Sequence, residues 1–588
     1  MKTRFLTYVA ALGIISGCEG MLDKYPLAQM SPETFFSTEN ELEAFSNTFY
    51  TVFPSTSIYS ESVDNYTQLE LPEELRGARI IPASGSGWTW NALRNYNTLL
   101  ENSVNCPDLD VRSEYNALAR FFRAYFYFEK VKRFGDVPWY DTQLGSDDPA
   151  LYKPRDSREY VMQKMIEDID YAIGNLPAER SLYRITRWTA LALKSRFCLF
   201  EGTFRKYHDV TYPEHDWQWY LQQAASAAEE FILNSGYTIY KADGPDKSYL
   251  NLFASENAIP DEIILARDYN EGLGVTHNAN FYTLGQSHGR PGMTRKIVAS
   301  YLMSDGSRFT DQEGWETMQF AQECRNRDPR LAQTIRTPGY TRIGASEELA
   351  PDLAVTVTGY QPVKFVSGTD SDAYNESYND LPIFRTAEVY LNYAEAKAEL
   401  GTLTQNDLEI SVNKLRERVG MPDFDMTVSP DPYLLSPETG YPQVAVKNSG
   451  ETRIAMILEI RRERTVELAQ EGFRYYDIMR WKEGKTFEQP LLGMYFPGPG
   501  DYDLDGNGSV DLCLYVGDKP ATTAKLSMKI NQDIILTDGE SGYVSPHYNN
   551  PGIWDEERDY LFPIPTDDRS LTMGALTQNP GWDDGLDF

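Results

Sequence analysis

An acidic run at residues 501–511 carries side chains whose types and spacing could bind a metal ion. Counted from Asp503 as the first position of a calcium loop, oxygen ligands fall at positions one, three, five, seven and nine. These ligands are Asp503, Asp505, Asn507, the Ser509 carbonyl and Asp511. Position twelve is Leu514, where such a loop normally carries a bidentate glutamate. The run predicts a structural Ca²⁺ site, with a solvated acidic turn as the alternative.

Two tryptophans have the chemistry to bind a sugar, because the C–H face of a sugar ring stacks on a flat aromatic surface. Trp88 and Trp90 follow a Gly/Ser loop at residues 84–87 and begin a helix that is expected to end near Asn105. Their spacing of two residues predicts that one faces outward and the other lies in the core. For each tryptophan, an ordinary core position is the alternative.

A second candidate for ligand binding is the loop from Asp268 to Arg290, which is rich in glycine, polar residues and aromatic residues at once. Loops of this kind often carry function, and a mobile surface loop without a ligand is the alternative. The residues that we predict to contact a ligand are Tyr269, Asn280, Phe281, Tyr282, His288 and Arg290.

The chain shows no sign of an enzyme active site. It contains no HExxH, GxSxG, P-loop or cysteine–histidine signature, and it has only five histidines. A pair of carboxylates acting as a glycosidase stays open as an alternative, because sequence does not show the separation that such chemistry requires. We expect a binding protein rather than an enzyme, with no cofactor apart from the predicted Ca²⁺.

Composition describes a large acidic protein. Of 588 residues, 87 are acidic and 55 are basic, which gives a formal charge of −32 at pH 7. Nucleic acid is therefore not expected as a partner, since no global positive field exists to attract phosphates. Aromatic residues make up 13% of the chain, and part of this surplus is expected on the surface to stack ligands.

The amino terminus reads as an export signal. Residues 1–17 combine two basic residues, an apolar run and small residues directly before Cys18. Residues 15–18 resemble the lipobox of bacterial lipoproteins, which implies cleavage before Cys18 and its acylation. An ordinary secretory signal is the alternative. Loss of residues 1–17 removes two basic residues and no acidic ones, so the formal charge becomes −34.

The other cysteines are Cys106, Cys198, Cys324 and Cys513. They are too scattered along the chain for a zinc site, and we expect buried thiols. A disulfide among them stays open as an alternative.

The elements that must position these residues are mostly helices. Apolar residues at helical spacing predict helices over residues 118–134, 160–176, 186–204, 387–400 and 408–419. Between residues 236 and 380 the pattern changes to loops with two short strand-like pieces, at 262–266 and 355–358. Residues 422–450 and 484–560 are similarly irregular.

A dense charge run at residues 459–467 is expected to lie on a helix. Glu459 with Arg462, and Arg464 with Glu467, are three residues apart, so the run is interpreted mainly as a self-paired surface face. Arg461 departs from the apolar stripe and is interpreted as a buried, paired arginine. A similar scaffold role is expected for Arg474, Asp477 and Arg480.

Five motifs, in order along the chain, resemble signatures of the SusD/RagB family of surface lipoproteins from Bacteroidota. They are LARFFRAYFYF with RFGDVP (118–128 and 133–138), FRTAEVYLNYAEA (384–396), EIRRER (459–464), EGFRYYDIMRW (471–481), and YLFPIP with NPGW (560–565 and 579–582). With the lipobox they cover nearly the whole chain.

This resemblance implies a mainly α fold. The expected architecture is a SusD-like helical body with tetratricopeptide-like helix pairs, beside a loop-rich, irregular ligand face with few short strands. The implied division is a signal peptide (1–17), a lipidated tether (18–30) and a single body (31–588). Within the body we expect a helical part (31–235), a loop-rich ligand-face region (236–380) and a second helical part with long insertions (381–588).

The resemblance also implies a function without catalysis. SusD-like proteins are anchored on the outer membrane by lipid, capture an oligosaccharide outside the cell, and pass it to a SusC-like TonB-dependent transporter. Family relatives commonly place aromatic ligand contacts near the loop that precedes Trp88. A peptide-capturing RagB-like lid, a surface glycosidase and a purely structural helical adaptor are the alternatives.

Overall fold

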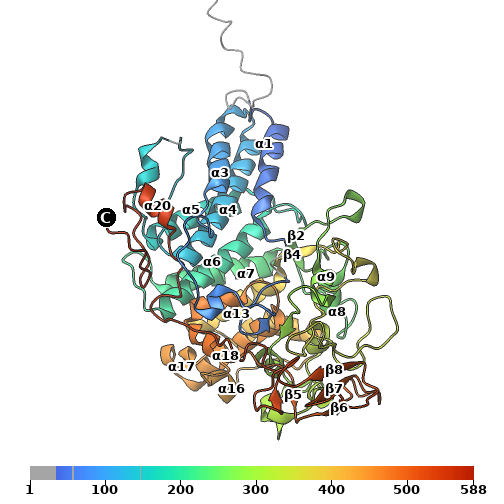
Figure 1. Ribbon diagram of the computed structural model, residues 1–588. Helices are drawn as coiled ribbons and strands as arrows, with labels where there is room; N and C mark the ends of the chain where they lie inside the picture. Colours follow the sequence, from blue (N-terminus) through green and yellow to red (C-terminus); the bar gives the residue numbers. More distant parts are fainter. Residues whose placement is uncertain (1–34, 56–58, 146) are drawn as a thin grey trace, which may run out of the picture.

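The computed structural model describes residues 35–55, 59–145 and 147–588. The predicted signal peptide, Cys18 and the tether at residues 18–30 lie outside this range. None of the helices in the described part combines the length and apolar composition that a membrane span requires. The fold is mainly α with a few short strands, as predicted (Figure 1).

The helices of the first half, up to the middle of the loop-rich region, are α1 (Glu39–Ser46), α2 (Glu73–Arg76), α3 (Asn91–Asn102), α4 (Leu109–Phe134), α5 (Arg158–Asn175), α6 (Arg187–Tyr207), α7 (Trp217–Asn234), α8 (Ser248–Ala254), α9 (Ala279–Leu284) and α10 (Arg295–Ser300). The remaining helices are α11 (Phe320–Glu323), α12 (Arg330–Thr334), α13 (Thr386–Leu400), α14 (Gln405–Glu409), α15 (Val412–Arg418), α16 (Pro432–Leu435), α17 (Gln443–Lys447), α18 (Glu451–Glu467), α19 (Arg474–Trp481) and α20 (Thr566–Leu571). The strands are β1 (Tyr66–Thr67), β2 (Ile263–Arg267), β3 (Gly292–Met293), β4 (Leu381–Arg385), β5 (Tyr495–Phe496), β6 (Gly500–Tyr502), β7 (Leu512–Tyr515), β8 (Leu526–Lys529) and β9 (Gly542–Tyr543).

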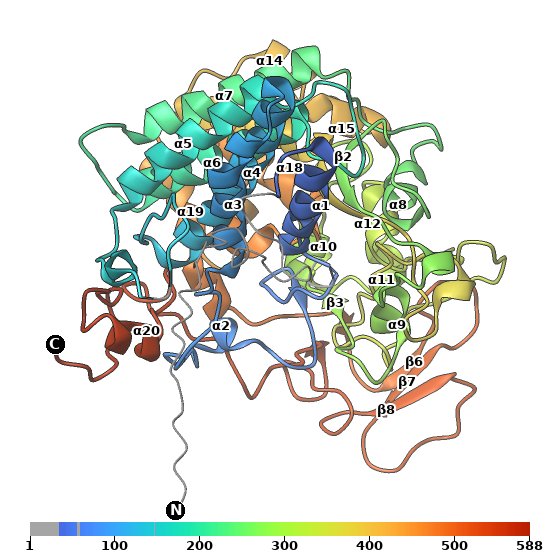
Figure 2. The same ribbon diagram turned by 90° about the horizontal axis from the view of Figure 1, so that it is seen from above.

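The long helices pack in consecutive pairs. Helix α4 packs on α5 and α6 on α7, while α13 packs against both α7 and α18. The α6–α7 contact is close because residue 202 is glycine, where a Cβ atom would come within 2.7 Å of the Leu221 side chain. These helices form one side of the molecule, and the loop-rich part with α8, α9, α11 and α12 forms the other (Figure 2).

Helix α4 shows which signals the apolar pattern missed. The expected helix begins at Leu118, but α4 begins at Leu109, where the Asp108 carboxylate accepts hydrogen bonds from the amides of Asp110 and Val111. The first two turns carry only scattered apolar residues and none of their residues is fully buried, so the apolar pattern does not predict them. The helix ends at Gly135, whose φ of +73° suits glycine.

Two predicted elements differ from the structure. The helix predicted over residues 408–419 is divided into α14 and α15, because the backbone leaves the helical conformation at Ser411, with φ of −132° and ψ of −95°. Residues 262–266 form β2, which pairs antiparallel with β4, but residues 355–358 are not a strand. There the Val357 amide donates to the Arg290 carbonyl, outside any regular ladder.

The charge run on α18 is buried, so the prediction of a surface face is wrong, although Glu459 and Arg462 do pair, at 3.2 Å, as expected. Glu467 is fully buried, and its carboxylate accepts hydrogen bonds from Arg385 at 2.8 Å and Arg418 at 2.6 Å. A third bond comes from Arg330 at 3.1 Å. One carboxylate thereby joins α18, β4, α15 and α12. Its partners lie 49 to 137 residues away in sequence, which helical spacing does not reveal.

The other predicted scaffold residues are buried and paired. Arg461 lies 3.2 Å from the Glu399 carboxylate and stacks over the Trp481 ring at 4.3 Å. Arg480 forms a bidentate pair with Glu395 at 2.5 and 2.8 Å. The remaining pairs are Arg464 with Asp477 and Arg474 with Asp64. The prediction that these residues support the scaffold is confirmed.

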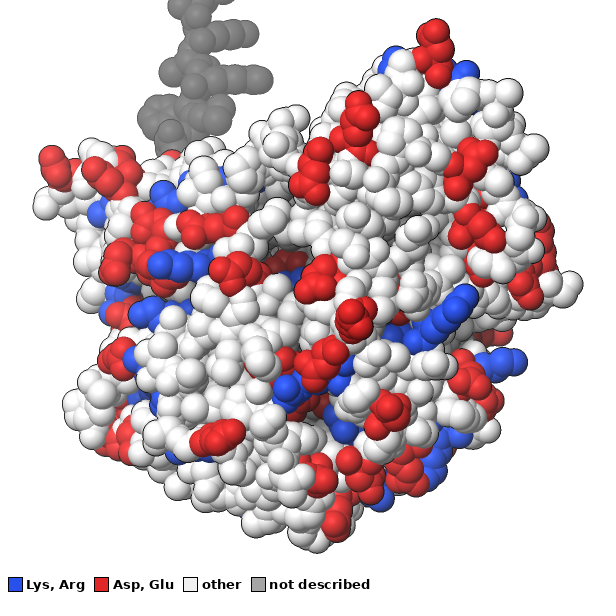
Figure 3. All heavy atoms as spheres, turned by 90° about the horizontal axis from the view of Figure 1, so that it is seen from below, with Lys and Arg blue, Asp and Glu red and all other residues white. Residues whose placement is uncertain are grey.

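The surface is acidic without a dominant basic region on the face that Figure 3 displays, where red and blue side chains intermix. Beneath the surface, Cys106, Cys198 and Cys513 are buried free thiols, and Cys324 is a partly buried one. The expectation of buried thiols is therefore confirmed for Cys106, Cys198 and Cys513 but not for Cys324.

Removing the charge of Glu467 should destabilise the whole protein. Glu467→Gln keeps the side-chain size but leaves three buried guanidinium groups short of a carboxylate, and we expect a loss of about 3–5 kcal/mol in the free energy of unfolding. Urea denaturation measures this loss. Glu417 pairs with Lys241 on the surface, so Glu417→Gln should change stability by less than about 1 kcal/mol. Equal effects of the two substitutions would contradict the role of the network.

Acid should destabilise the fold through Glu395. Burial alone would raise its pKa, but the charge and hydrogen bonds of Arg480 outweigh burial and lower the pKa from 4.5 to about 2. A lowered folded-state pKa contributes stability that is present above pH 4.5 and is lost as pH falls toward 2. Denaturation midpoints measured from pH 6 to pH 2 should fall most steeply in that window. In Glu395→Gln the fall should be shallower, and an unchanged slope would argue against this assignment.

Candidate functional site

The structure places the two predicted tryptophans at one entrance to the helical body. Trp88 is 4% exposed and packs edge-on against Phe134 at 4.9 Å and Trp90 at 5.3 Å. Trp90 directly precedes α3 and is partly exposed. Trp88 is thus a core residue that supports Trp90, and Trp90 is the tryptophan that a ligand can reach.

Trp90 lines a cavity of about 410 Å³, which we call the tryptophan pocket. This volume lies within the range of about 300–1,000 Å³ that is common for small-molecule sites. Its aromatic wall consists of Trp88, Trp90, Tyr140 and Tyr152, and polar side chains reach it from α3, from residues 142–145 and from α20. The polar residues are Asn91, Arg94, Asn97, Thr142, Asp568 and Thr572.

A buried lysine holds Trp90 from behind. The Lys130 ammonium lies 5.4 Å from the Trp90 ring centre and 4.7 Å from that of Phe126, and it donates to the Gly87 carbonyl. Burial lowers the pKa of Lys130 to about 8, against the opposing pull of Glu129. This contact connects the loop at residues 84–87 to α4 and orients the indole.

In the predicted ligand loop, Tyr269 and Asn280 are structural residues, which corrects their expected role as ligand contacts. Tyr269 is 6% exposed and packs on His277. Asn280 is fully buried, where its amide donates to the Gly368 carbonyl at 2.9 Å and its oxygen accepts from the Ser367 amide at 2.9 Å. Both residues hold the loop in place, Tyr269 through its ring and Asn280 through the hydrogen bonds of its side chain.

Phe281 and His288 do reach the surface, together with a tyrosine that the sequence did not indicate. The Phe281 ring lies 4.6 Å from His288 and 5.5 Å from Tyr374, and Tyr374 is 62% exposed. We call these three residues the aromatic trio. Asn278 and Asn375 exchange hydrogen bonds of 2.7 and 2.6 Å, which fasten the two loops that carry the trio.

The sequence does not predict Tyr374 as a ligand contact, because its partners in the trio are almost a hundred residues away. The only local signal was a tyrosine within a loop rich in serine, aspartate and asparagine, residues 367–379. Such a loop is a plausible ligand contact by composition alone, but its neighbours are set by tertiary structure.

Tyr282 and Arg290 turn toward the protein rather than to open solvent. The Tyr282 hydroxyl donates to the Gln68 side chain, and Arg290 donates to the Leu353 carbonyl at 2.8 Å. Both side chains are half-buried. They connect the predicted loop to residues 60–70 and 350–360, so they shape the ligand face more than they form its surface.

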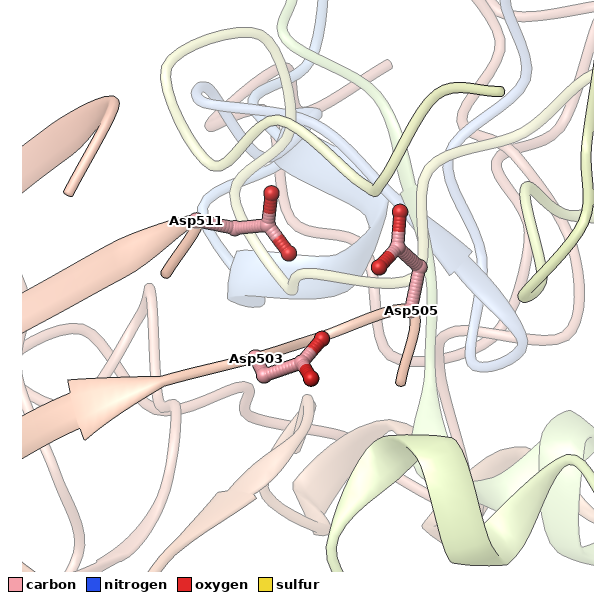
Figure 4. A group of neighbouring side chains, drawn as sticks. All are labelled: Asp503, Asp505 and Asp511. Atoms are coloured by element: carbon pink, nitrogen blue, oxygen red, sulfur yellow. The ribbon is translucent and has the colours of Figure 1, made fainter. Parts of the chain in front are cut away.

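The predicted calcium ligands Asp503, Asp505 and Asp511 come together, as Figure 4 shows. Asp503 follows β6 and Asp511 precedes β7, two antiparallel strands. One carboxylate oxygen from each residue lies within 4.8 Å of the others. Burial, followed by the nearby Asp511 and Asp503 charges, raises the pKa of Asp505. The donor set of three carboxylates matches the preference of Ca²⁺ for hard oxygen ligands.

The two remaining predicted ligands are arranged differently. The Asn507 amide donates to Asp505 at 2.9 Å, and its oxygen accepts from the Ser509 amide at 2.8 Å. Lys525 approaches Asp511 at 3.0 Å from the solvent side. Binding of a cation would require the Asn507 side chain to rotate and Lys525 to withdraw, while the three aspartates already converge.

Comparisons with known proteins agree with this architecture. The sequence model of the SusD family matches residues 261–582, and a second model, described as starch-binding associating with outer membrane, matches residues 88–199. A SusD-like protein of Formosa agariphila is 25% identical, over 83% of this chain and 93% of its own length.

Two crystal structures from Bacteroides fragilis share the fold. A SusD-like carbohydrate-binding protein has a TM-score of 0.68 and 20% identity, over 92% of this chain and 99% of that chain. A second SusD-like protein has a TM-score of 0.67 and 21% identity, over 95% of this chain and 100% of that chain. Since the family model covers more than half of the sequence, this protein belongs to the SusD family.

Proposed function

We propose that this protein captures oligosaccharides at the cell surface and delivers them to a SusC-like TonB-dependent transporter in the outer membrane. The observation that carries the proposal is the tryptophan pocket, in which Trp90, Tyr140 and Tyr152 surround a space edged with polar side chains. This combination provides stacking surfaces for the apolar faces of sugar rings and hydrogen-bonding groups for their hydroxyls.

The geometry of the pocket suits a chain end rather than a deeply enclosed molecule. Trp90 and Tyr140 stand nearly perpendicular, with ring centres 5.6 Å apart, so they form two walls of a corner. Arg94 and Asn91 belong to the first turn of α3, beside the indole, and Asp568 approaches from α20. One sugar ring stacked on Trp90 would have both donors and acceptors within reach.

The exposed aromatic trio extends the proposal to a longer ligand. Phe281, His288 and Tyr374 offer a second stacking surface on the loop-rich side of the molecule. A solved structure with the same fold is described as carbohydrate-binding, which supports the ligand class in this proposal. In this proposal the protein binds and releases its ligand unchanged.

The place of action follows from the amino terminus. We propose that Cys18 is acylated and anchors the protein to the outer membrane, with the body facing the outside. The family description of association with the outer membrane supports this location. In that position the body acts as a lid, which captures a ligand and closes over the barrel of its transporter.

We also propose that the loop between β6 and β7 binds a structural Ca²⁺. The ion would neutralise the repulsion between Asp503, Asp505 and Asp511 and rigidify a hairpin in which Gly506 and Gly508 have positive φ. No part of sugar binding is assigned to this ion.

Substitution of Trp90 should separate glycan capture from the alternatives. In calorimetric titration with a panel of oligosaccharides, the wild-type body should bind one glycan class, and Trp90→Ala should weaken that binding about tenfold to a hundredfold because the stacking surface is lost. Trp219 is a partly buried tryptophan that stacks on His215 and does not line this pocket. Trp219→Ala should therefore bind as the wild type does.

The same titration distinguishes the other functions. Heat from a mixed peptide digest, with none from glycans, would assign the protein to the peptide-capturing branch and contradict our proposal. Release of shortened sugars, followed by chromatography, would indicate a glycosidase. Co-purification of a large outer-membrane barrel with the tagged full-length chain tests the transporter partner.

Calcium binding should depend on the three converging carboxylates. We expect the wild-type protein to bind one Ca²⁺ in calorimetric titration, and Asp503→Asn with Asp505→Asn to abolish that heat because two anionic ligands are lost. Asp518 is an exposed acid in the same region, and Asp518→Asn should leave the affinity unchanged. Absence of saturable heat from the wild-type protein would identify the loop as a solvated acidic turn.

A further inference from the structure

A second cavity, which we call the central cavity, lies where the helical body meets the segments at residues 60–63 and 72–75. Its volume is about 470 Å³, and it is lined by α4, α6, α19, the start of β4 and these segments. None of the predicted ligand residues lines it. The cavity therefore needs an explanation of its own.

The walls of the central cavity are largely aromatic. Phe128 and Phe200 face it from α4 and α6, Tyr475 and Tyr476 from α19, and Phe562 from the carboxyl-terminal segment. The rings of Tyr475 and Tyr476 are perpendicular, with centres 5.2 Å apart. Flat rings in two orientations provide stacking surfaces rather than the interdigitated aliphatic packing that fills a core.

Three oxygens on the cavity wall are buried without a hydrogen-bond partner in the described part of the chain. They are the Glu61 Oε1, the Ser62 hydroxyl and the Tyr475 hydroxyl. A buried polar group without a partner costs about 1–3 kcal/mol, so native proteins rarely leave several around one space. The three oxygens can both donate and accept when the carboxyl is protonated, which matches a ligand with hydroxyl groups.

The cations around the cavity are already paired with carboxylates, with one exception. Lys132 pairs with Glu129 at 2.5 Å, and Arg196 forms a bidentate pair with Glu388 at 2.6 Å. Arg464 and Arg480 are paired with Asp477 and Glu395, as described above. Arg133 has no carboxylate partner among the described residues, but it donates to Ser86 and lies over the Phe562 ring. The wall thus offers little to a strongly charged ligand.

The surroundings of Glu61 favour the neutral form of its carboxyl group. Burial raises its pKa to about 8 and outweighs the attraction of Lys364 and Arg474. The nearby carboxylates of Asp64 and Glu471 add to the increase. A neutral carboxyl, two hydroxyls and aromatic walls form a site for a neutral polyhydroxylated molecule.

We propose that the central cavity is a second binding site, which takes one neutral sugar unit between its aromatic walls and the oxygens of Glu61, Ser62 and Tyr475. The class of ligand rests on the proposed function, whereas the existence of a site rests on the cavity and its unpaired oxygens. This site is distinct from the tryptophan pocket, since Trp90 does not line it.

Calorimetric titration of the Trp90→Ala variant tests this proposal, because that substitution removes the stacking surface of the tryptophan pocket and weakens sugar binding there. The probes are D-glucose, D-galactose, D-mannose and N-acetyl-D-glucosamine. We expect Trp90→Ala to bind at least one of them at a single site, and addition of Tyr475→Phe to weaken that binding about three- to tenfold by removing one hydrogen bond. Tyr495→Phe, on a tyrosine that lines neither cavity, should have no effect.

Glu61→Ala and Ser62→Ala provide further tests of the same wall, and thermal unfolding shows whether each variant folds. If Glu61→Ala does not fold, Tyr475→Phe and Ser62→Ala carry the test. Absence of monosaccharide binding in Trp90→Ala, or a binding affinity that none of the three wall substitutions changes, would overturn the central site and show that solvent occupies it. Oligosaccharide binding by the wild-type protein would still stand in that case. Conversely, monosaccharide binding without any oligosaccharide binding would support the cavity and contradict the proposed capture site.

Discussion

The buried carboxylate of Glu467 is the constraint on which the rest of the structure depends. Removing a charge from water costs several kcal/mol, and this cost is offset only when well-placed opposite charges surround it. Arg385, Arg418 and Arg330 meet that requirement together, and each comes from a different element. Docking of the helices on the loop-rich side is therefore constrained by the need to bring these three arginines to Glu467. Lys364 extends the network by pairing with Glu471 at 2.6 Å, which fixes a further segment of the loop-rich side.

This rigid frame explains how irregular loops can present ordered side chains. Arg385 ends β4, and β4 pairs with β2 at the start of the loop that carries Phe281 and His288. The loop is then fastened to residues 367–377 by Asn280 and by the Asn278–Asn375 exchange. On the other side, Trp90 is held between α3 and the Lys130 ammonium of α4. Both aromatic surfaces are thus preorganised, which reduces the entropy lost when a ligand binds.

The two cavities differ in a way that matters for binding. The tryptophan pocket is edged by polar side chains from several segments, as expected for a site that meets ligands from solution. The central cavity combines rings with three unpaired oxygens, in a wall whose cations are nearly all paired. These ion pairs also hold the scaffold together, because Arg464 of α18 pairs with Asp477 of α19 and Arg480 of α19 pairs with Glu395 of α13. The ion pairs that hold the body together thereby leave its central space almost neutral.

The sequence by itself determined the long helices, because α5 and α13 carry apolar residues at helical spacing and α6 is rich in alanine and leucine, which are local signals. It also determined the convergence of three aspartates, since their ligand spacing lies within one short hairpin. Only tertiary structure decided the contacts between distant segments. It broke the helix at Ser411, left residues 355–358 outside a sheet, buried Asn280 and brought Tyr374 to Phe281. It placed Glu467 among arginines up to 137 residues away, and it set Glu61 beside Tyr475. Local periodicity reports which face of an element is buried, whereas the partner on that face is chosen by the packing of the whole chain.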